Sequence, residues 1–296
     1  MTEQSKCGFI AIIGRPNVGK STLLNVLLQK KISITSDKPQ TTRSQVLGIK
    51  TVGPVQEVYI DTPGIHHTEK RAINRYMNRL ASSVIGDADV IVFMIDATRW
   101  QEDDALILEK VKHTKAAVIL AINKIDKLKN KALLFPLIEK LQAKFNFTHI
   151  IPLSAANSEN VSVLEKEIIA LLPEGPHLFP DEQITDKTER FQVSELIREK
   201  VIRVTSEEIP YSINVEIESF KDEEKLLSIS AIIWVEREGQ KPIIIGVGGE
   251  RLKAIGTQAR KDMERLFNKK VFLRLWVKVK DNWTDDERIL KSLGYE

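Results

Sequence analysis

Residues 14–22 of this chain read Gly14-Arg15-Pro16-Asn17-Val18-Gly19-Lys20-Ser21-Thr22. They follow the apolar run 9–13 and precede a helical pattern that ends near Gln29. Strand, glycine-rich loop and helix in this order attract polyphosphate, because the loop N–H groups, the helix N-terminus and Lys20 are all electropositive. Ser21 is the expected Mg²⁺ ligand, and the alternative is a glycine-rich turn that matches the pattern by chance. The stretch predicts a phosphate-binding α/β domain.

Length and composition limit the class of protein. The 296 residues favour about two domains, and 42% apolar with 29% charged residues is typical of a soluble globular protein. A net charge of +3 is too small to indicate polyanion binding by itself, so the position of the charges must decide. No stretch has the pattern of a signal peptide or a membrane span. We therefore expect a cytosolic protein, or one bound only peripherally to a membrane.

Few residues are suited to disulfides or transition-metal sites. Cys7 is the only cysteine, which excludes an internal disulfide and a cysteine-cluster metal site and fits a reducing compartment. His66 and His67 are adjacent and have no carboxylate or cysteine partner at suitable spacing. They are predicted to be exposed loop residues, with metal binding as the remote alternative.

Two later segments are predicted to complete a Mg²⁺–phosphate site. Residues 32–43 are polar and broken by proline, so they predict a loop in which a threonine gives its hydroxyl to Mg²⁺ and its N–H to a γ-phosphate. The alternative is a solvated surface loop. The apolar run 55–60 then ends in Asp61-Thr62-Pro63-Gly64. Asp61 is placed to hold Mg²⁺ through water, and the Gly64 N–H to meet the γ-phosphate.

Apolar strands and amphipathic helices alternate through this half of the chain. The patterns predict strands at 44–52, 55–60, 90–96, 117–122 and 149–152, and helices at 69–86, 103–112, 131–144 and 161–172. Continuous apolar strands that alternate with helices indicate a mainly parallel sheet covered on both faces. The predicted fold class is α/β, with a doubly wound sheet.

The strand before residue 123 ends in Asn123-Lys124-Ile125-Asp126. A carboxylate such as Asp126 accepts hydrogen bonds from the ring N–H and the exocyclic amine of guanine, a pair that adenine does not present. Lys124 is predicted to lie along the base plane, and Asn123 to tie this loop to the phosphate loop. Backbone N–H groups of Ser154 and Ala155 are predicted to meet guanine O6. In this order the motifs predict GTP and GDP as ligands, with an ordinary polar loop as the alternative.

A second domain is predicted beyond a proline-rich segment. We expect a nucleotide domain at 1–173, a linker at 174–189 and a smaller α/β domain with a C-terminal tail at 190–296. The predicted elements of the last part are a helix at 190–204, strands at 211–220 and 226–236, a glycine turn, a helix at 252–267 and a strand at 271–279.

The glycine turn reads Gly246-Val247-Gly248-Gly249. It has the G-x-x-G form with which KH modules clamp about four nucleotides of single-stranded RNA. Ten Lys or Arg and three Asp or Glu lie between residues 244 and 280, a net charge of +7 in the half that carries the turn. The alternative is a tight turn beside a solvated helix. Trp234 and Trp276 lie in strand patterns, which predicts packing roles for them.

Together these motifs resemble the Era-like family of bacterial GTPases, which combine a P-loop GTPase domain with a type II KH domain. The resemblance also covers Arg198-Glu199-Lys200, the stretch 235–241 and the stretch 275–280, so it spans nearly the whole chain. It implies a GTP-hydrolysing switch that binds the 3′ end of 16S ribosomal RNA and assists maturation and assembly of the 30S subunit. We expect a cytoplasmic monomer, with peripheral association with the inner membrane as a further expectation.

Each motif then has a predicted role. Lys20 neutralises the β- and γ-phosphates, Ser21 and Thr42 hold Mg²⁺, Asp61 holds it through water, Gly64 senses the γ-phosphate and Asp126 reads guanine. The predicted nucleotide site as a whole comprises Gly14, Arg15, Pro16, Asn17, Val18, Gly19, Lys20, Ser21, Thr22, Asp61, Thr62, Pro63, Gly64, Ile65, Asn123, Lys124, Ile125, Asp126, Ser154 and Ala155.

Two positions depart from the patterns of related proteins. Ile65 stands where Ras-like GTPases have the glutamine that positions the attacking water, so we expect slow intrinsic turnover and help from elsewhere. In related GTPases with this hydrophobic substitution a monovalent cation such as K⁺ supplies charge, and Asn17 is the residue expected to hold it. Val247-Gly248 replaces the basic residue usual in Era-like KH turns. RNA phosphates are therefore expected to meet backbone N–H groups of the turn and Arg251 or Lys253.

One alternative belongs to another functional class. The chain could be a nucleotide-gated scaffold that acts through protein or membrane contacts in cell-cycle control, with the KH fold as a protein-binding module. The uncharged Val247-Gly248 turn favours this alternative, and the net charge of +7 around the turn opposes it.

Overall fold

The structure of this protein is a computed structural model, which describes residues 4–38, 41–65, 71–205, 212–293 and 295. The chain folds into two compact units. The first unit comprises residues 1–33, 42–69 and 77–186, and the second unit comprises residues 34–41, 70–76 and 187–296. Each unit has a hydrophobic core of its own, as expected for domains. The predicted exposed loop at His66 and His67 lies outside the described residues.

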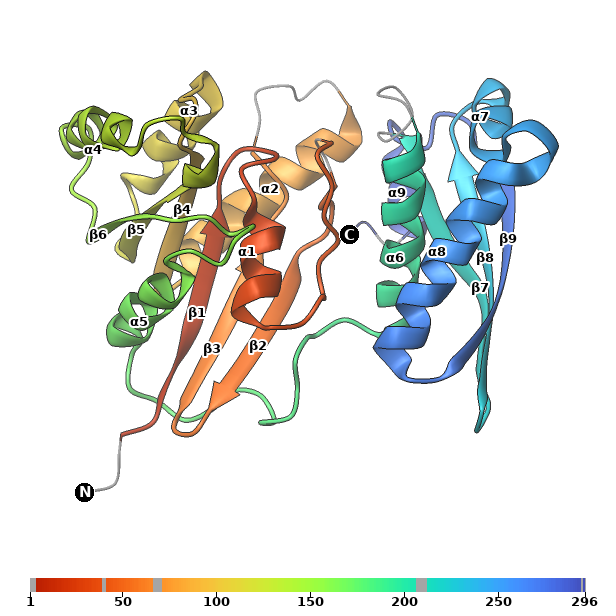
Figure 1. Cartoon of the computed structure of the whole chain (residues 1–296), viewed down its shortest axis with the longest axis horizontal. Coiled ribbons are helices and arrows are strands. Elements are labelled where there is room, and N and C mark those ends of the chain that lie inside the picture. The colour runs from red at the N-terminus through yellow and green to blue at the C-terminus, as the bar shows by residue number, and fades with distance from the viewer. Residues whose placement is uncertain (1–3, 39–40, 66–70, 206–211, 294, 296) are drawn as a thin grey trace. The chain divides into compact units, whose positions relative to one another are not determined.

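The first unit is built on a mainly parallel sheet with the strand order β2-β3-β1-β4-β5-β6 (Figure 1). Its strands are β1 (Lys6–Ile13), β2 (Val46–Val52), β3 (Val55–Asp61), β4 (Val90–Asp96), β5 (Ala117–Asn123) and β6 (His149–Pro152). Only the pairing of β2 with β3 is antiparallel among the described strands of this sheet. The α/β fold predicted from the alternation of strands and helices is confirmed.

Helices cover both faces of this sheet (Figure 1). On one face α1 (Lys20–Leu27) and α5 (Val161–Leu171) pack with Ile10 and Ile12 of β1. On the other face α2 (Ala72–Asp87), α3 (Glu102–Val111) and α4 (Leu134–Gln142) pack with Ala11 and Ile13. Because successive strand residues point to opposite faces, a strand buried on both sides reads as a continuous apolar run. The parallel strands bring their carboxyl ends to one edge of the sheet, where the predicted nucleotide motifs begin.

The segment predicted to be a linker belongs largely to the first unit, whose residues extend to 186. The Ile49 N–H donates to the Ile184 carbonyl at 2.7 Å, so this segment pairs with the free edge of β2. The buried side chain of Gln56 accepts the N–H groups of Leu178 and Phe179 at 2.8 and 3.0 Å. The linker predicted at 174–189 is therefore too long, because residues 174–186 belong to the first unit. A segment that covers a sheet edge through backbone hydrogen bonds needs no apolar periodicity.

The second unit has the strand order β7-β8-β9 (Figure 1). Its elements are α6 (Glu189–Val204), β7 (Asn214–Asp222), β8 (Leu226–Val235), α7 (Lys241–Ile245), α8 (Glu250–Phe267), β9 (Lys270–Val279) and α9 (Glu287–Ser292). β7 and β8 pair antiparallel, whereas β8 and β9 pair parallel. The predicted order of helix, strand, strand, turn, helix and strand is confirmed. The structure adds two short helices that were not predicted, α7, which has Pro242 in its first turn, and α9 after β9. None of the described helices of either unit is long and apolar enough to cross a membrane.

A buried carboxyl in β3 makes stability depend on pH. Glu57 is 1% exposed and accepts a hydrogen bond from the Tyr59 hydroxyl. Burial raises the pKa of Glu57 to about 7, from an ordinary value of 4.5. The folded state then keeps a proton that the unfolded chain has lost, so this group lowers stability as pH rises from 4.5 through about 7.

Glu57→Gln, which imitates the protonated form, is expected to raise the free energy of unfolding by about 3 kcal/mol at about pH 8 and to leave it nearly unchanged at about pH 4.5. Urea unfolding of parent and variant at both pH values measures the difference. The same change at both pH values would contradict a titration of Glu57 and would indicate an effect of packing alone.

Candidate functional site

The predicted phosphate loop connects β1 to α1 in the first unit. Gly19 precedes α1 with φ 107°, and a Cβ atom there would collide with the side-chain amide of Asn123. The first residue of α1, Lys20, is buried, and its Nζ donates to the carbonyls of Gly14 at 3.0 Å and Arg15 at 3.1 Å. Burial lowers the pKa of Lys20 to about 8, although the Asp61 carboxylate acts in the opposite direction. The ammonium is thus held inside the curl of the loop, where a polyphosphate would satisfy it better than carbonyls do.

Three predicted Mg²⁺ ligands converge beside this lysine. The Ser21 Oγ lies 2.8 Å from Thr42 Oγ1 and donates to Asp61 Oδ2, also at 2.8 Å. Asp61 is fully buried, and its Oδ1 has no hydrogen-bond partner among the described residues. Burial raises the pKa of Asp61, and Lys20 opposes that rise. A buried carboxylate oxygen without a partner, next to two hydroxyls, is the hard oxygen donor set that suits Mg²⁺.

The chain after Asp61 runs against the phosphate loop. A Cβ atom on Gly64 would lie 2.5 Å from the Pro16 backbone nitrogen, so only glycine fits this approach. The Thr62 hydroxyl donates to the Ile12 carbonyl at 3.0 Å and fixes the segment to β1. The next side chain, Ile65, is 1% exposed and packs in the core of the sheet face that α2 covers. It therefore has neither the polarity nor the position to orient a water molecule.

The loop after β5 is tied to the phosphate loop, as predicted for Asn123. The Asn123 Nδ2 donates to the Val18 carbonyl at 2.7 Å. Lys124 adopts φ 66° and donates to the Asn17 carbonyl at 2.7 Å and to Asp96 Oδ2 at 2.8 Å. These bonds join two loops that are about a hundred residues apart in the sequence. They hold the predicted base-binding and phosphate-binding segments in one fixed arrangement.

The predicted donors to guanine O6 are engaged within the protein. The Ser154 N–H donates to the Glu159 carbonyl at 3.1 Å, and the Ala155 N–H donates to Asn123 Oδ1 at 2.9 Å. The hydrogen bonds in the structure do not support the prediction that these two N–H groups face guanine O6. Their effect is to position the loop, because the Ser154 hydroxyl also donates to Asp126 Oδ1 at 2.6 Å. The bond from the Ala155 N–H to Asn123 joins residues 32 positions apart, which the local sequence motif does not indicate.

Arg15 also differs from a phosphate ligand. Its side chain is buried and turned away, since Nε donates to Asp104 Oδ2 at 3.1 Å and a guanidinium nitrogen donates to the Arg99 carbonyl at 3.4 Å. Asp96 lies 3.8 Å from the same guanidinium. Arg15 therefore braces the loop against the segments around α3. Sequence reasoning missed Asp96 and Asp104. An acid directly after a buried strand is a signal that could have identified Asp96.

In the second unit a hollow of about 390 Å³ lies between α8 and β9, beside the G-x-x-G turn. It is lined by Gly249, Leu252, Lys253, Gly256, Thr257, Arg260, Leu273 and Leu275. We call it the α8–β9 groove. Lys253 and Arg260 lie in this groove beside leucine side chains and the N-terminus of α8. This arrangement suits a phosphodiester chain whose bases contact the leucines.

The predicted RNA-binding residues divide into two groups. Gly249 and Lys253 line the α8–β9 groove, whereas Arg251 donates to the Ile243 carbonyl of α7 and is absent from the lining. Gly246 has φ 76°, and a Cβ atom there would lie 2.8 Å from Arg251 Cβ, so this glycine is required by close approach. Val247 is 91% exposed and Gly248 is open to solvent. Arg251 thus stabilises the turn, and Lys253 is the basic residue of the pair that is available to a ligand.

Sequence reasoning missed Gly256, Thr257 and Arg260. Together with Lys253 they follow the i, i+3, i+4, i+7 spacing that places residues on one face of a helix. The same spacing, applied to the predicted helix at 252–267, could have found them. Arg260 supplies the second cation of the groove.

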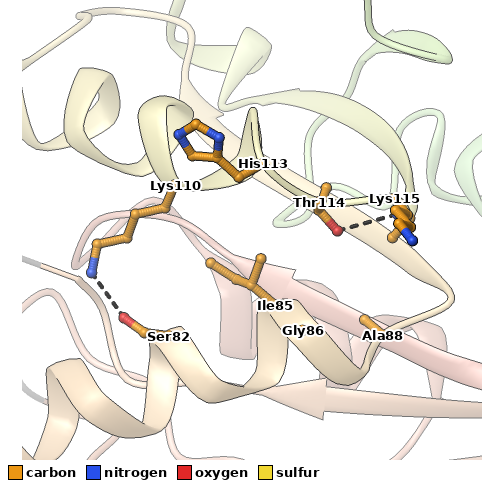
Figure 2. A pocket seen from close by; sticks show the side chains of 9 residues that line it. Ser82, Ile85, Gly86, Ala88, Lys110, His113, Thr114 and Lys115 are labelled. Atoms are coloured by element: carbon orange, nitrogen blue, oxygen red, sulfur yellow. Dashed lines mark hydrogen bonds between the residues drawn. The ribbon is translucent and has the colours of Figure 1, made fainter.

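The first unit has a further hollow at the opposite end of its sheet (Figure 2). Its volume is about 580 Å³, and Figure 2 shows it between the last turns of α2 and the segment from α3 to β5. Lys110 donates to the Ser82 hydroxyl across it at 2.8 Å. Ligands of open α/β sheets bind at the carboxyl ends of the strands, and this hollow lies at the amino end of β5. It therefore does not belong to the nucleotide site.

Two protein-family models match the chain. Residues 9–124 match the model described as a 50S ribosome-binding GTPase, and residues 208–284 match the KH domain model. The first match begins in β1 and includes the phosphate loop, and the second includes the G-x-x-G turn.

Relatives are similar over the whole chain. The GTPase Era of Haemophilus influenzae is 59% identical over 299 residues, which cover 100% of this chain and 99% of the relative. The GTPase Era of Pasteurella multocida is 58% identical over 290 residues, which cover 98% of this chain and 95% of the relative.

Two solved structures match both units. A crystal structure of Era in complex with MgGDPNP and nucleotides 1506–1542 of 16S ribosomal RNA has a TM-score of 0.95 at 43% identity, and the match covers 98% of this chain and 99% of that chain. A crystal structure of an Aquifex aeolicus Era variant bound to GDP and AlF4⁻ matches with the same TM-score, identity and coverage.

Proposed function

This chain belongs to the Era family of GTPases, and we propose that it is a nucleotide-controlled switch that binds the 3′ end of 16S ribosomal RNA and assists maturation and assembly of the 30S subunit. The solved Era that holds MgGDPNP and a 16S ribosomal RNA fragment supports the RNA part of the proposal. The α8–β9 groove supports it from this chain's own residues.

The convergence of Ser21, Thr42 and Asp61 beside the buried Lys20 is the observation that carries the GTPase mechanism. These residues come from α1, from the segment before β2 and from the end of β3. Two hydroxyls and a buried carboxylate would hold Mg²⁺, which when bound neutralises charge on the β- and γ-phosphates. Thr42 lies in the loop before β2, and its N–H is proposed to meet the γ-phosphate. Its contact with the metal would therefore depend on whether a γ-phosphate is present.

The remaining roles follow from charge and position. Lys20 would exchange its bonds to loop carbonyls for bonds to phosphate oxygens, and the charge-assisted bonds are stronger. The Gly64 N–H would meet the γ-phosphate, since this residue already lies against Pro16 of the phosphate loop. Asp126 would read guanine. Catalysis is then mainly positioning and neutralisation of charge, without a general base from position 65.

A monovalent cation is proposed to compensate for Ile65. Asn17 lies within the phosphate loop with φ 63°, and its backbone carbonyl is fixed by Lys124. Its amide oxygen would help to hold K⁺ beside the phosphates and so supply positive charge to the transition state.

Hydrolysis of GTP is therefore expected to be about tenfold faster in KCl than in NaCl of equal ionic strength, because K⁺ is the ion proposed to fit this position. Asn17→Gly removes the amide oxygen and tolerates the positive φ of this residue, and it is expected to abolish the difference while Mg-GDP affinity is retained. Single-turnover hydrolysis in the two salts measures the effect. Equal rates for the parent protein in both salts would rule out the cation.

RNA binding and the scaffold alternative make different predictions. If the α8–β9 groove binds RNA, a short oligonucleotide from the 16S ribosomal RNA 3′ end binds with sub-micromolar to micromolar affinity, and the affinity differs between the GTP-analogue and GDP states. Filter binding in both nucleotide states tests this. A protein that binds GTP but retains no RNA in either state would favour the scaffold.

Two properties rest on the family resemblance. We propose that the protein works as a monomer, and that it acts in the cytoplasm with peripheral contact to the inner membrane. Sedimentation velocity tests the first property, and flotation with anionic vesicles tests the second.

A further inference from the structure

The second unit has a sheet face that the proposed function does not use and whose side chains on β9 are exposed. In β8 and β9, alternate residues enter the core beneath α6 and α8, including Ile229, Ala231, Leu273 and Leu275. The residues between them point the other way. On β9 these are Phe272, Arg274, Trp276 and Lys278, and their register partners on β8 are Ser228, Ser230, Ile232 and Trp234. We call this set the outer face.

Two large aromatic side chains are solvent-accessible on the outer face. Phe272 is 45% exposed and Trp276 is 41% exposed, although the strand pattern predicted a packing role for Trp276. Trp283 differs, because it is fully buried and donates its indole N–H to the Ser212 carbonyl at 3.2 Å. Aromatic side chains that are exposed beside cations can stack on unpaired bases.

Cations alternate with these aromatics. Phe272, Arg274, Trp276 and Lys278 are spaced by two residues along one strand, about 6.6 Å apart. The Arg274 guanidinium lies 4.9 Å from the Phe272 ring centroid. Lys280 lies 5.5 Å from the Trp234 ring centroid. The acid Glu216 accepts the Trp234 indole N–H at 2.7 Å on the same face, but it belongs to β7, which β8 separates from β9. The β9 side of the outer face is therefore aromatic and positively charged.

We propose that the outer face is a second binding surface for single-stranded nucleic acid, distinct from the α8–β9 groove. Unpaired bases stack on Phe272 and Trp276, and the phosphates between them meet Arg274 and Lys278. Stacking on aromatic side chains combined with cations along the backbone is how sheets bind single strands without a duplex. A protein partner of purely apolar chemistry would have to desolvate the charges of Arg274 and Lys278 without compensation.

The two surfaces share one strand. Leu273 and Leu275 of β9 line the α8–β9 groove, whereas Phe272 and Trp276 lie on the opposite side of the same strand. β9 is the last strand in the described order β7-β8-β9, so its outer edge is not paired within that sheet. An RNA chain that leaves the groove can pass around this edge and continue on the outer face. The inference thus extends the proposed RNA function and rests on it for occupancy of the groove.

Two RNA lengths separate the surfaces. A single-stranded oligonucleotide of about five nucleotides is long enough for a G-x-x-G clamp, and one of about fifteen nucleotides can reach both surfaces. The double variant Phe272→Ala/Trp276→Ala is expected to bind the short RNA within about twofold of the parent and the long RNA at least tenfold more weakly. Fluorescence anisotropy with both RNAs measures this. Phe135→Ala, which removes a 76% exposed aromatic from the first unit, is the matched control and is expected to change neither affinity.

A second pair of variants tests the charges. Arg274→Gln/Lys278→Gln is expected to lower the salt slope for the long RNA by about two and to leave the slope for the short RNA unchanged. Phe272→Tyr/Trp276→Phe keeps the stacking surfaces and is expected to retain long-RNA affinity. Equal long-RNA affinity in the parent and Phe272→Ala/Trp276→Ala would overturn the inference while leaving the groove intact. A parent that binds neither RNA would overturn both the groove and the outer face. The inference would also be overturned if the parent self-associates and Phe272→Ala/Trp276→Ala abolishes this self-association. The outer face would then be an interface between copies of the chain.

Discussion

Asp126→Asn is expected to exchange guanine for xanthine as the preferred base. The Asp126 side chain is exposed at the start of the loop after β5, and the Ser154 hydroxyl orients it through Oδ1. A carboxylate there accepts two hydrogens from guanine, whereas an amide places a donor opposite the exocyclic amine. Xanthine has an oxygen at that position. The loss of a bidentate charged contact corresponds to about 2–4 kcal/mol, or a factor of about 30 to 1,000 in GDP affinity.

Titration with fluorescent GDP and XDP in the presence of Mg²⁺ measures both halves of this prediction. Ser154→Ala is the matched control, because it removes the hydroxyl that orients Asp126 and leaves the carboxylate in place. It is expected to cost about 1 kcal/mol for GDP without favouring XDP. Unchanged GDP affinity in Asp126→Asn would exclude Asp126 from the nucleotide site.

The sequence predicted the motifs of the nucleotide site because each one is local. A glycine loop after a strand, or an acid at a strand end, carries its meaning within a few residues, and the parallel sheet then gathers the strand ends at one edge. Thus Ser21, Thr42 and Asp61 lie together although up to 40 positions separate them. The doubly wound fold followed from the same alternation of apolar strands and helices.

Most contacts between distant segments were beyond sequence reasoning, although the bond from Asn123 to the phosphate loop was predicted. Asn123 holds both the Val18 carbonyl and the Ala155 N–H, and this pairing decided that Ala155 positions the loop. The contact of Arg15 with Asp104 joins residues 89 positions apart, so the side chain of a residue predicted for the nucleotide site braces the loop. Nothing in the sequence spacing indicates the pairs Asn123–Ala155 and Arg15–Asp104. These contacts depend on which strands are neighbours in the sheet and on where each helix begins and ends.

The G-x-x-G turn shows a different limit. Its position and glycine pattern were predicted, but the partner of Arg251 was not, because α7 was missed and the Ile243 carbonyl belongs to it. The groove residues were recoverable from the period of α8, since Lys253, Gly256 and Arg260 share one face. Helical periodicity therefore identifies the binding residues only once the bounds of α8 are known. The residues of α7, which hold the turn through Arg251, must first be assigned to a helix of their own.

Val247→Asp/Gly248→Asp is expected to weaken RNA binding at least a hundredfold at low salt. Both positions are exposed, and a Cβ atom on Gly248 meets nothing within 4 Å, so the two carboxylates fit without collision. Gly248 has φ 59°, a conformation that Asp and Asn tolerate better than other side chains do. The carboxylates would stand where the turn presents its N–H groups to phosphate, and repulsion at that distance grows as salt is lowered.

The matched control is Val247→Asn/Gly248→Asn, which has nearly the same shape and conformational preference and no charge. It is expected to bind RNA within about fivefold of the parent, so the difference between the two double variants isolates electrostatic repulsion from any loss of fit. Filter binding of the 16S ribosomal RNA 3′ end between about 50 and 300 mM salt measures both affinity and salt slope. Lys253→Ala and Arg260→Ala should each lower the slope by about one, because each removes a phosphate contact from the α8–β9 groove. GTP affinity should stay constant in all four variants, since every substituted residue belongs to the second unit and the nucleotide site to the first. If the double Asp variant binds as tightly as the double Asn variant, the turn does not face phosphate and the scaffold alternative gains support.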